Sequence, residues 1–160
     1  MRAKEPYTRR TPWAMSEQNV EVVRGYFEVF NKWLASYWSD PKPALEDSPG
    51  LDAVFARLDP EAEWDWPLSP ETFRGREQLL QAVADWLETV SHWRIDVEDL
   101  IEGSQGRVLL VGRVVARGKG SGAPIHQPIF TAVTVRNGKI ARIDDHTEKA
   151  KAVEAAGLSD

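Results

Sequence analysis

Cysteine is absent from this chain of 160 residues, and histidine occurs only three times. Without cysteine the chain has no disulfide framework, no thiolate nucleophile and no zinc-thiolate site. His92, His126 and His146 do not have the spacing of metal ligands on one helix, so we expect no metal site. Apolar runs are too short to cross a membrane. No apolar secretory segment follows the first residues, and we expect a cytoplasmic protein.

Basic charge is also scarce, because 20 lysines and arginines stand against 25 aspartates and glutamates. Part of this basic charge lies in residues 1–15, which we interpret as a disordered basic tail since they are proline-containing and not amphipathic. Residues 16–160 have the length of a single domain. Their acidic balance disfavours polyanions, and we predict no nucleic-acid partner.

Hydrophobic periodicity divides the domain into helices followed by strands. Apolar residues recur every three or four positions from Ser16 to Tyr37 or Trp38, which predicts a long amphipathic helix. After this helix we expect a loop at 40–50, a helix at 51–58, a strand at 63–67 and a helix from 75. The period then changes to that of strands, which are expected near 93–103, near 108–115 and on both sides of 137–138, and a last helix is expected at 149–156. Helices before a run of antiparallel strands indicate the α+β class, with helices against one side of a bent sheet.

Asn137-Gly138 is the strongest signal for a tight hairpin. A regular register outward from this turn pairs Ala132 with Ile143 and Phe130 with Asp145, on one face of the sheet. The opposite face then carries a second apolar set, Val133, Val135 and Ile140. Both faces are therefore predicted to be covered.

Four sequence features occur together in a fixed order. They are Leu58-Asp59-Pro60-Glu61-Ala62-Glu63-Trp64, Phe73-Arg74-Gly75-Arg76-Glu77, Asn137-Gly138-Lys139-Ile140, and Asp145 followed by Glu148-Lys149-Ala150 and Glu154-Ala155-Ala156-Gly157-Leu158. Over residues 16–158 this set resembles the SnoaL-like, or polyketide-cyclase-like, branch of the nuclear transport factor 2-like superfamily, which also holds steroid Δ5-isomerases and limonene epoxide hydrolases.

The resemblance implies a cone-shaped curved antiparallel sheet, an α+β barrel closed by the N-terminal helices, with a pocket inside the cone. It also implies a homodimer through the outer sheet face, which agrees with the apolar second face of the predicted hairpin. It does not define an activity, because the superfamily hosts several chemistries.

Asp145 is the predicted acid/base residue. On the predicted register it lies among Phe130, Ala132 and Ile143, and burial among apolar groups raises the pKa of a carboxyl group and suits it to proton transfer. The resemblance supports this role, because epoxide-hydrolase-like relatives use an aspartate at the matching place after Gly-Lys-Ile. The alternative is that Asp145 caps the following helix or pairs with Arg113.

Two catalytic patterns of the superfamily are incomplete. The hydrolase pattern Arg-x-Asp keeps Arg113 but has Val115 in place of the aspartate, and Trp66 stands before Pro67 where steroid isomerases place their base. A polyketide-cyclase-like reaction remains, in which one aspartate deprotonates a carbon beside a carbonyl without metal or cofactor. The donors considered for polarising that carbonyl are Tyr26, Arg113 and His126.

The pocket wall is predicted to suit a small, flat hydrophobic molecule. Core packing is the default role of large aromatics, and the residues expected to line the pocket are Phe30, Trp64, Trp66, Phe130, Ala132 and Ile143. No glycine-rich loop precedes a helix in the manner of a phosphate site, so we expect no nucleotide cofactor. Two hypotheses stay open: a cofactor-free lyase, isomerase or cyclase using Asp145, and a non-catalytic small-molecule-binding or dimerisation module.

Overall fold

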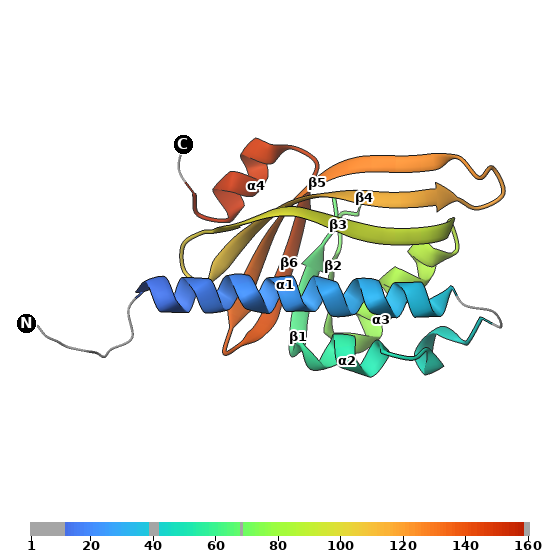
Figure 1. Ribbon diagram of the computed structural model, residues 1–160, viewed down its shortest axis with the longest axis horizontal. Coiled ribbons are helices and arrows are strands. Elements are labelled where there is room, and N and C mark those ends of the chain that lie inside the picture. Colours follow the sequence, from blue (N-terminus) through green and yellow to red (C-terminus); the bar gives the residue numbers. More distant parts are fainter. Residues whose placement is uncertain (1–11, 39–41, 68, 159–160) are drawn as a thin grey trace, which may run out of the picture.

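The computed structural model describes residues 12–38, 42–67 and 69–158 (Figure 1). Its helices are α1 (Pro12–Tyr37), the short 3-10 helix η1 (Leu45–Asp47), α2 (Leu51–Ala56), α3 (Gly75–Leu87) and α4 (Lys149–Ala155). Its strands are β1 (Leu58–Asp65), β2 (Thr72–Arg74), β3 (Val90–Glu102), β4 (Arg107–Gly118), β5 (Pro124–Arg136) and β6 (Lys139–His146). None of the helices in this described part is long and apolar enough to span a membrane.

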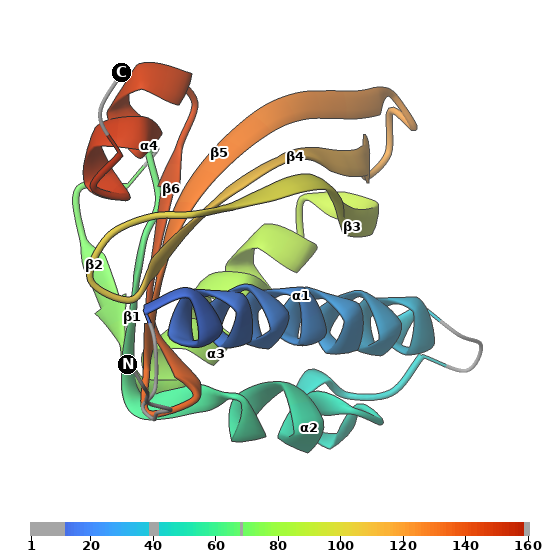
Figure 2. The ribbon, with the colours of Figure 1, turned by 60° about the vertical axis from the view of Figure 1, so that its left-hand side comes forward.

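All six strands form one curved, open sheet in the order β2-β1-β6-β5-β4-β3. β1 and β6 run parallel, whereas the other neighbouring strands are antiparallel. Figure 2 shows α1 lying along the concave side of the sheet, with α3 behind it and α2 below, while α4 lies on the opposite side next to β6. The α+β class and the helices against a bent sheet are thus confirmed.

The long helix α1 forms the centre of the main core. Its buried residues include Val23, Phe27, Phe30 and Leu34, whose spacing of three or four positions places them on one stripe facing the sheet. The helix begins at Pro12, earlier than the predicted Ser16, because proline is tolerated in a first helical turn. Residues 12–15 therefore belong to α1, and the rest of the predicted tail, residues 1–11, lies outside the described part.

The predicted hairpin is present, but its predicted register is wrong beyond the first pairs. Asn137 and Gly138 have positive φ angles of 54° and 76°, as a two-residue turn of this kind requires. Val135 pairs with Ile140 as predicted, but Thr134 then pairs with Arg142, so Ala141 is an extra residue in β6. This bulge shifts every later pair by one position.

The shift exchanges the two faces of β5 relative to the prediction. Thr131, Val133 and Val135 are buried on the concave side, where Val133 and Val135 join Ile140 in the core under α1. The apolar face that we expected a second copy to cover is therefore covered within the chain. Ala132 instead packs with Leu109 against α4 residues Ala152 and Ala156, and Phe130 borders this second cluster.

The first strand also differs from its prediction. β1 starts at Leu58 and contains Pro60, although proline usually ends a strand. Proline is tolerated because the β1–β6 register is irregular between Leu58 and Glu63, and β2 pairs only with residues 63–65. The short β2 was not predicted, since three residues are too few to show a period.

Candidate functional site

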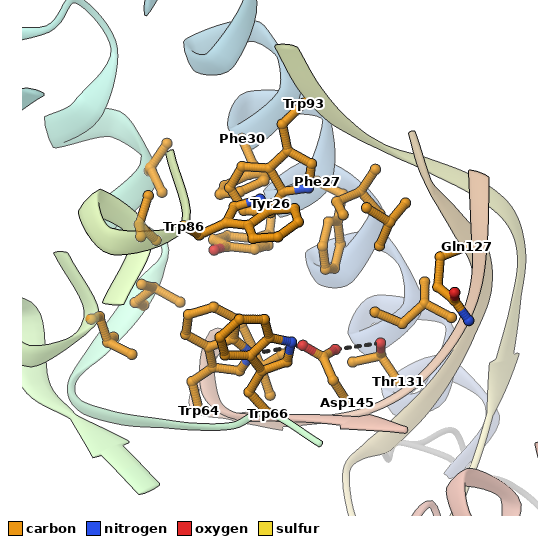
Figure 3. Close-up of a pocket in the computed structure, with 18 of the residues that line it drawn as sticks. Tyr26, Phe27, Phe30, Trp64, Trp66, Trp86, Trp93, Gln127, Thr131 and Asp145 are labelled. Atoms are coloured by element: carbon orange, nitrogen blue, oxygen red, sulfur yellow. Dashed lines mark hydrogen bonds between the residues drawn. The ribbon is translucent and has the colours of Figure 1, made fainter. Parts of the chain in front are cut away.

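A cavity of about 380 Å³ lies between the concave face of the sheet and helices α1, α2 and α3 (Figure 3). We call it the chamber. Its wall is mostly apolar and aromatic, as small-molecule sites usually are. The polar side chains that line it are few: Tyr26, Gln127, Thr131, Asp145, His146 and Thr147. Trp33 and the other indoles of the wall also carry N–H groups, and the Trp33 Nε1 donates to Ser48 Oγ at 2.7 Å.

Asp145 is the carboxylate that faces the chamber. Trp64 Nε1 donates to its Oδ2 at 2.6 Å, and Thr131 Oγ1 donates to its Oδ1 at 2.7 Å (Figure 3). Burial raises the pKa of Asp145 above its ordinary value, and it outweighs the two hydrogen bonds, which act in the opposite direction. The neighbouring Asp144 adds to the rise and His146 opposes it.

Three strands bring this arrangement together. Trp64 on β1 is in register with Ile143 on β6, and Thr131 on β5 is opposite Asp145. Residues in register share a face of the sheet, so all four side chains are directed to the concave side. The Ala141 bulge sets this alignment, because it is the bulge that places Thr131 rather than Phe130 opposite Asp145.

Tyr26 reaches the chamber from α1 and is buried. Burial raises the pKa of its phenol, and the negative charge of Asp145 raises it further, so the group stays protonated. Its ring is stacked on Phe30 at a centroid distance of 5.9 Å. In the described part of the chain its hydroxyl has no hydrogen-bond partner, which leaves this O–H available as a donor to a ligand.

The other two predicted donors lie outside the chamber. The alternation of β4 directs Arg113 to the outer face, where its Nε lies 3.5 Å from Glu98 Oε2. His126 is opposite Val115 on the same outer face and is exposed. The alternative pairing of Asp145 with Arg113 is therefore not found. Of the three donors considered, Tyr26 is the one that lines the chamber together with Asp145.

Four of the six predicted wall residues line the chamber: Phe30, Trp64, Trp66 and Ile143. The predicted positions of Phe130 and Ala132 are wrong, because the bulge turns the even-numbered residues of β5 toward α4. Thr131 was missed for the same reason. A register that allowed an extra residue in β6 would have found it.

Trp86 on α3 and Trp93 on β3 also belong to the chamber wall, although sequence analysis treated such residues as core by default. Their rings meet edge to face at 5.9 Å, and Trp86 meets Trp66 in the same way at 6.0 Å. Both indole N–H groups are buried without a hydrogen-bond acceptor among the described residues. Over the same residues, no cluster of histidine and carboxylate side chains is arranged to hold a metal ion.

Solved structures of nuclear transport factor 2-like proteins share this fold. Residues 43–143 match the SnoaL-like domain, and the chain belongs to that family. No functionally curated protein matches the sequence.

Several solved structures share the fold at low sequence identity. A putative SnoaL-like polyketide cyclase from Jannaschia sp. CCS1 is 20% identical, with a TM-score of 0.64 over 96% of this chain and 99% of that one. TerC co-crystallised with polyporic acid is 19% identical, with a TM-score of 0.61 over 86% and 96%. A ketosteroid isomerase-like protein from Catenulispora acidiphila in complex with trimethylamine is 17% identical, with a TM-score of 0.56 over 82% and 94%. These likenesses establish the fold.

Proposed function

We propose that the chamber binds a small hydrophobic carbonyl compound and that Asp145 moves a proton at the carbon beside the carbonyl, in a cofactor-free lyase, isomerase or cyclase reaction. The observation that carries this proposal is the position of Asp145. It is a carboxyl group of raised pKa in an aromatic chamber that Tyr26, with its free hydroxyl, also lines. A general base is most effective when its pKa lies near the working pH.

The proposed step begins with ionised Asp145. A carboxylate oxygen takes the proton from the carbon, the C–H electron pair forms a C=C bond, and the carbonyl π pair moves onto the carbonyl oxygen. Tyr26 donates a hydrogen bond to this enolate oxygen, which is the type of charge stabilisation that contributes most to such reactions. Asp145 then returns the proton, or the enolate carbon attacks a second carbonyl carbon of the same molecule and closes a ring. In the second case the π pair of that carbonyl moves onto its oxygen, which takes the proton from Asp145.

The two hydrogen bonds of Asp145 fit both protonation states. The indole N–H of Trp64 can only donate a hydrogen bond, so Asp145 Oδ2 accepts from it in both states. The Thr131 hydroxyl donates to the carboxylate and can turn to accept from the protonated acid. The family relationship supports the reaction class, since the SnoaL-like structure from Jannaschia is named a putative polyketide cyclase. TerC, co-crystallised with polyporic acid, supports an organic ligand.

Hydrogen–deuterium exchange tests the proposal without knowledge of the natural substrate. A panel of flat and alicyclic ketones is incubated with the protein in D₂O, and NMR follows loss of the proton beside the carbonyl. We expect exchange by the wild type, and a fall of about 100-fold or more in Asp145→Asn, the range of general-base catalysis. Tyr26→Phe should slow exchange as well, because it removes the donor.

Arg113→Gln is the matched control, since this variant changes a residue on the outer face. It should exchange at the wild-type rate. Equal exchange by Asp145→Asn and the wild type would refute the acid/base role.

A non-catalytic binding module is the second candidate. It is favoured by the fact that both oxygens of Asp145 are already hydrogen-bonded inside the protein. Under this alternative, ketones raise the melting temperature of the wild type and of Asp145→Asn equally. No exchange occurs in either protein.

We also propose that the protein forms a homodimer through the outer face of the sheet. α4 covers this face only around Leu109 and Ala132. Beyond α4, Val115 lies between strands that carry exposed His126 and Arg94, and it belongs to neither core cluster. A second copy placed here would cover Val115.

A further inference from the structure

We infer that the chamber accepts a second class of ligand, lipophilic amines with a single positive charge, for which Asp145 is the counter-ion and the tryptophan rings are the cage. This inference rests on the proposed function in one respect only: the chamber must admit a ligand. It adds a charge preference that the carbonyl proposal does not require.

The first argument is that no lysine or arginine of the described residues lies beside Asp145 in the chamber. The charged or titratable groups around its carboxyl are Tyr26 from α1 and the flanking Asp144 and His146 from β6, while β1 and β5 contribute the neutral Trp64 and Thr131. No lysine or arginine lines the chamber among the described residues. His146 Nε2 lies 3.2 Å from Asp144 Oδ2, so the imidazole is nearest to another carboxylate, although Nε2 makes no hydrogen bond among the described residues. An enclosed carboxylate without a counter-ion is costly, and a cationic ligand would supply one.

The second argument is the aromatic wall. Trp64 and Trp66 are near parallel at 6.0 Å and lie beside Asp145, and Figure 3 shows Tyr26, Phe30, Trp86 and Trp93 across the chamber from them. Edge-to-face contacts at 6.0 Å and 5.9 Å continue this wall from Trp66 through Trp86 to Trp93. Aromatic rings attract cations, tryptophan most strongly, and aromatic cages are the usual sites for quaternary ammonium groups.

The third argument is an acidic hollow that adjoins the chamber. The two share Trp66, Pro67, Asp145, His146 and Thr147. Five carboxylates line the hollow, and Asp145 itself is one of them. Lys151 is its one lysine or arginine among the described residues, and its Nζ lies 3.9 Å from Glu148 Oε2. One of the five, Asp65, is paired with Arg142 from outside the hollow. The remaining negative charge beside the chamber favours the approach of cations and disfavours anions.

Two probes of nearly the same shape isolate the charge. Benzyltrimethylammonium carries a quaternary nitrogen where neopentylbenzene has a carbon, so the pair differs in charge and little in volume. Five tryptophans line the chamber, so quenching of tryptophan fluorescence reports binding of either probe. We expect the cation to bind about tenfold more tightly than the neutral probe, within the range of cation–π and charge pairing in an enclosed site.

Asp145→Asn is the decisive variant, because asparagine keeps the shape and the hydrogen bonds. Its amide oxygen can accept from Trp64, and its amide nitrogen can donate to the Thr131 hydroxyl. The variant should lose the preference for the cation and retain the neutral probe. Asp85→Asn, which removes one negative charge from the exposed face of α3, should bind both probes as the wild type does.

The affinity for the cation should also rise with pH as Asp145 ionises, while that for neopentylbenzene stays constant. Equal affinity of the wild type for both probes, or a cation preference that survives in Asp145→Asn, would overturn the inference. Binding of neopentylbenzene alone would remove the amine inference and leave the carbonyl proposal standing. If neither probe nor any ketone bound, both would fall.

Discussion

Asp145 takes its properties from two side chains on other strands and from the chamber that encloses it. Trp64 and Thr131 fix the two oxygens, and the apolar chamber removes the carboxyl from water. Desolvation disfavours the ionised form, whereas the two donors favour it. Because desolvation is the larger effect, the group is a weaker acid than a surface aspartate.

This difference in pKa predicts how stability depends on pH. The carboxyl of Asp145 has a higher pKa in the folded protein than in the unfolded chain, so the folded state binds the proton more tightly. Its contribution to stability is therefore present below the unfolded pKa and is lost as pH rises through the folded pKa. In Asp145→Asn this loss is absent. Urea unfolding from about pH 4 to about pH 8 should show the stability of the variant rising relative to the wild type. A constant difference over this window would contradict the prediction.

The Trp64 indole N–H offers a second test at the residue scale. Trp64→Phe removes the donor to Oδ2 and leaves most of the ring, so the ionised form loses support and the pKa of Asp145 should rise further. We expect a cost of about 1–2 kcal/mol in the free energy of unfolding for the lost hydrogen bond and ring volume. The pH at which exchange activity is half-maximal should move upward.

Trp66→Phe is the matched control, because the Trp66 ring stacks on Trp64 at a centroid distance of 6.0 Å, whereas the described donors to Asp145 are Trp64 and Thr131. This variant should lower stability without moving the pH profile. A shift of the same size in both variants would mean that the aromatic wall, and not the hydrogen bond, sets the pKa.

At the scale of elements, long periodic segments were predictable and irregularities were not. The buried stripe of α1 and the alternation of β3 are visible in the sequence because many residues repeat the same period. The Ala141 bulge has no such signal, since alanine is compatible with either face. Asp145 was nevertheless expected in the pocket, and it does line the chamber. The bulge lies between the turn and Asp145, so it changes which residue of β5 pairs with Asp145.

A second irregularity, in β3, gives a prediction for Gly112. The register of β3 with β4 shifts between Val97 and Asp99, directly beside Gly112. A Cβ at Gly112 would lie 2.3 Å from the backbone oxygen of Asp96, so the strands would have to separate. Gly112→Ala should cost about 2 kcal/mol or more in the free energy of unfolding.

Gly120→Ala provides the comparison, because this turn glycine has a φ of +86° and open space around its Cβ position. Its cost should be limited to backbone strain, about 1 kcal/mol. Thermal and urea unfolding of the two variants would measure both costs in the free energy of unfolding. Equal costs would mean that the contact with Asp96 relaxes easily.

At the scale of the whole molecule, the composition and the order of elements were enough to predict the fold class. Which residues of β5 are covered by α1 and which by α4 was not predictable. It depends on the register of β5 with β6, and that register depends on one extra residue in β6. The proposed dimer surface is accordingly the face bearing Val115, and not the face bearing Val133.

Light scattering and analytical ultracentrifugation test this surface. We expect the wild type to be dimeric and Val115→Glu to be monomeric with an unchanged circular dichroism spectrum, because a charge that becomes buried in an interface is disfavoured. Val97→Glu introduces the same side chain at a residue that is 37% exposed on the opposite parity of the sheet, and it should remain dimeric. A monomeric wild type, or a dimeric Val115→Glu, would exclude this interface.

The parallel pairing of β1 with β6 has a consequence for how the protein is made. Strand β1 emerges from the ribosome early, yet the neighbour that links it to the rest of the sheet is the last strand to be synthesised. Until that strand is available, the aromatic side chains of the first half have no completed enclosure, and contacts of long sequence separation form slowly. Nascent chains that stop before residue 139 should therefore recruit chaperones, and the sheet should be completed only after residues 139–146 have left the ribosome.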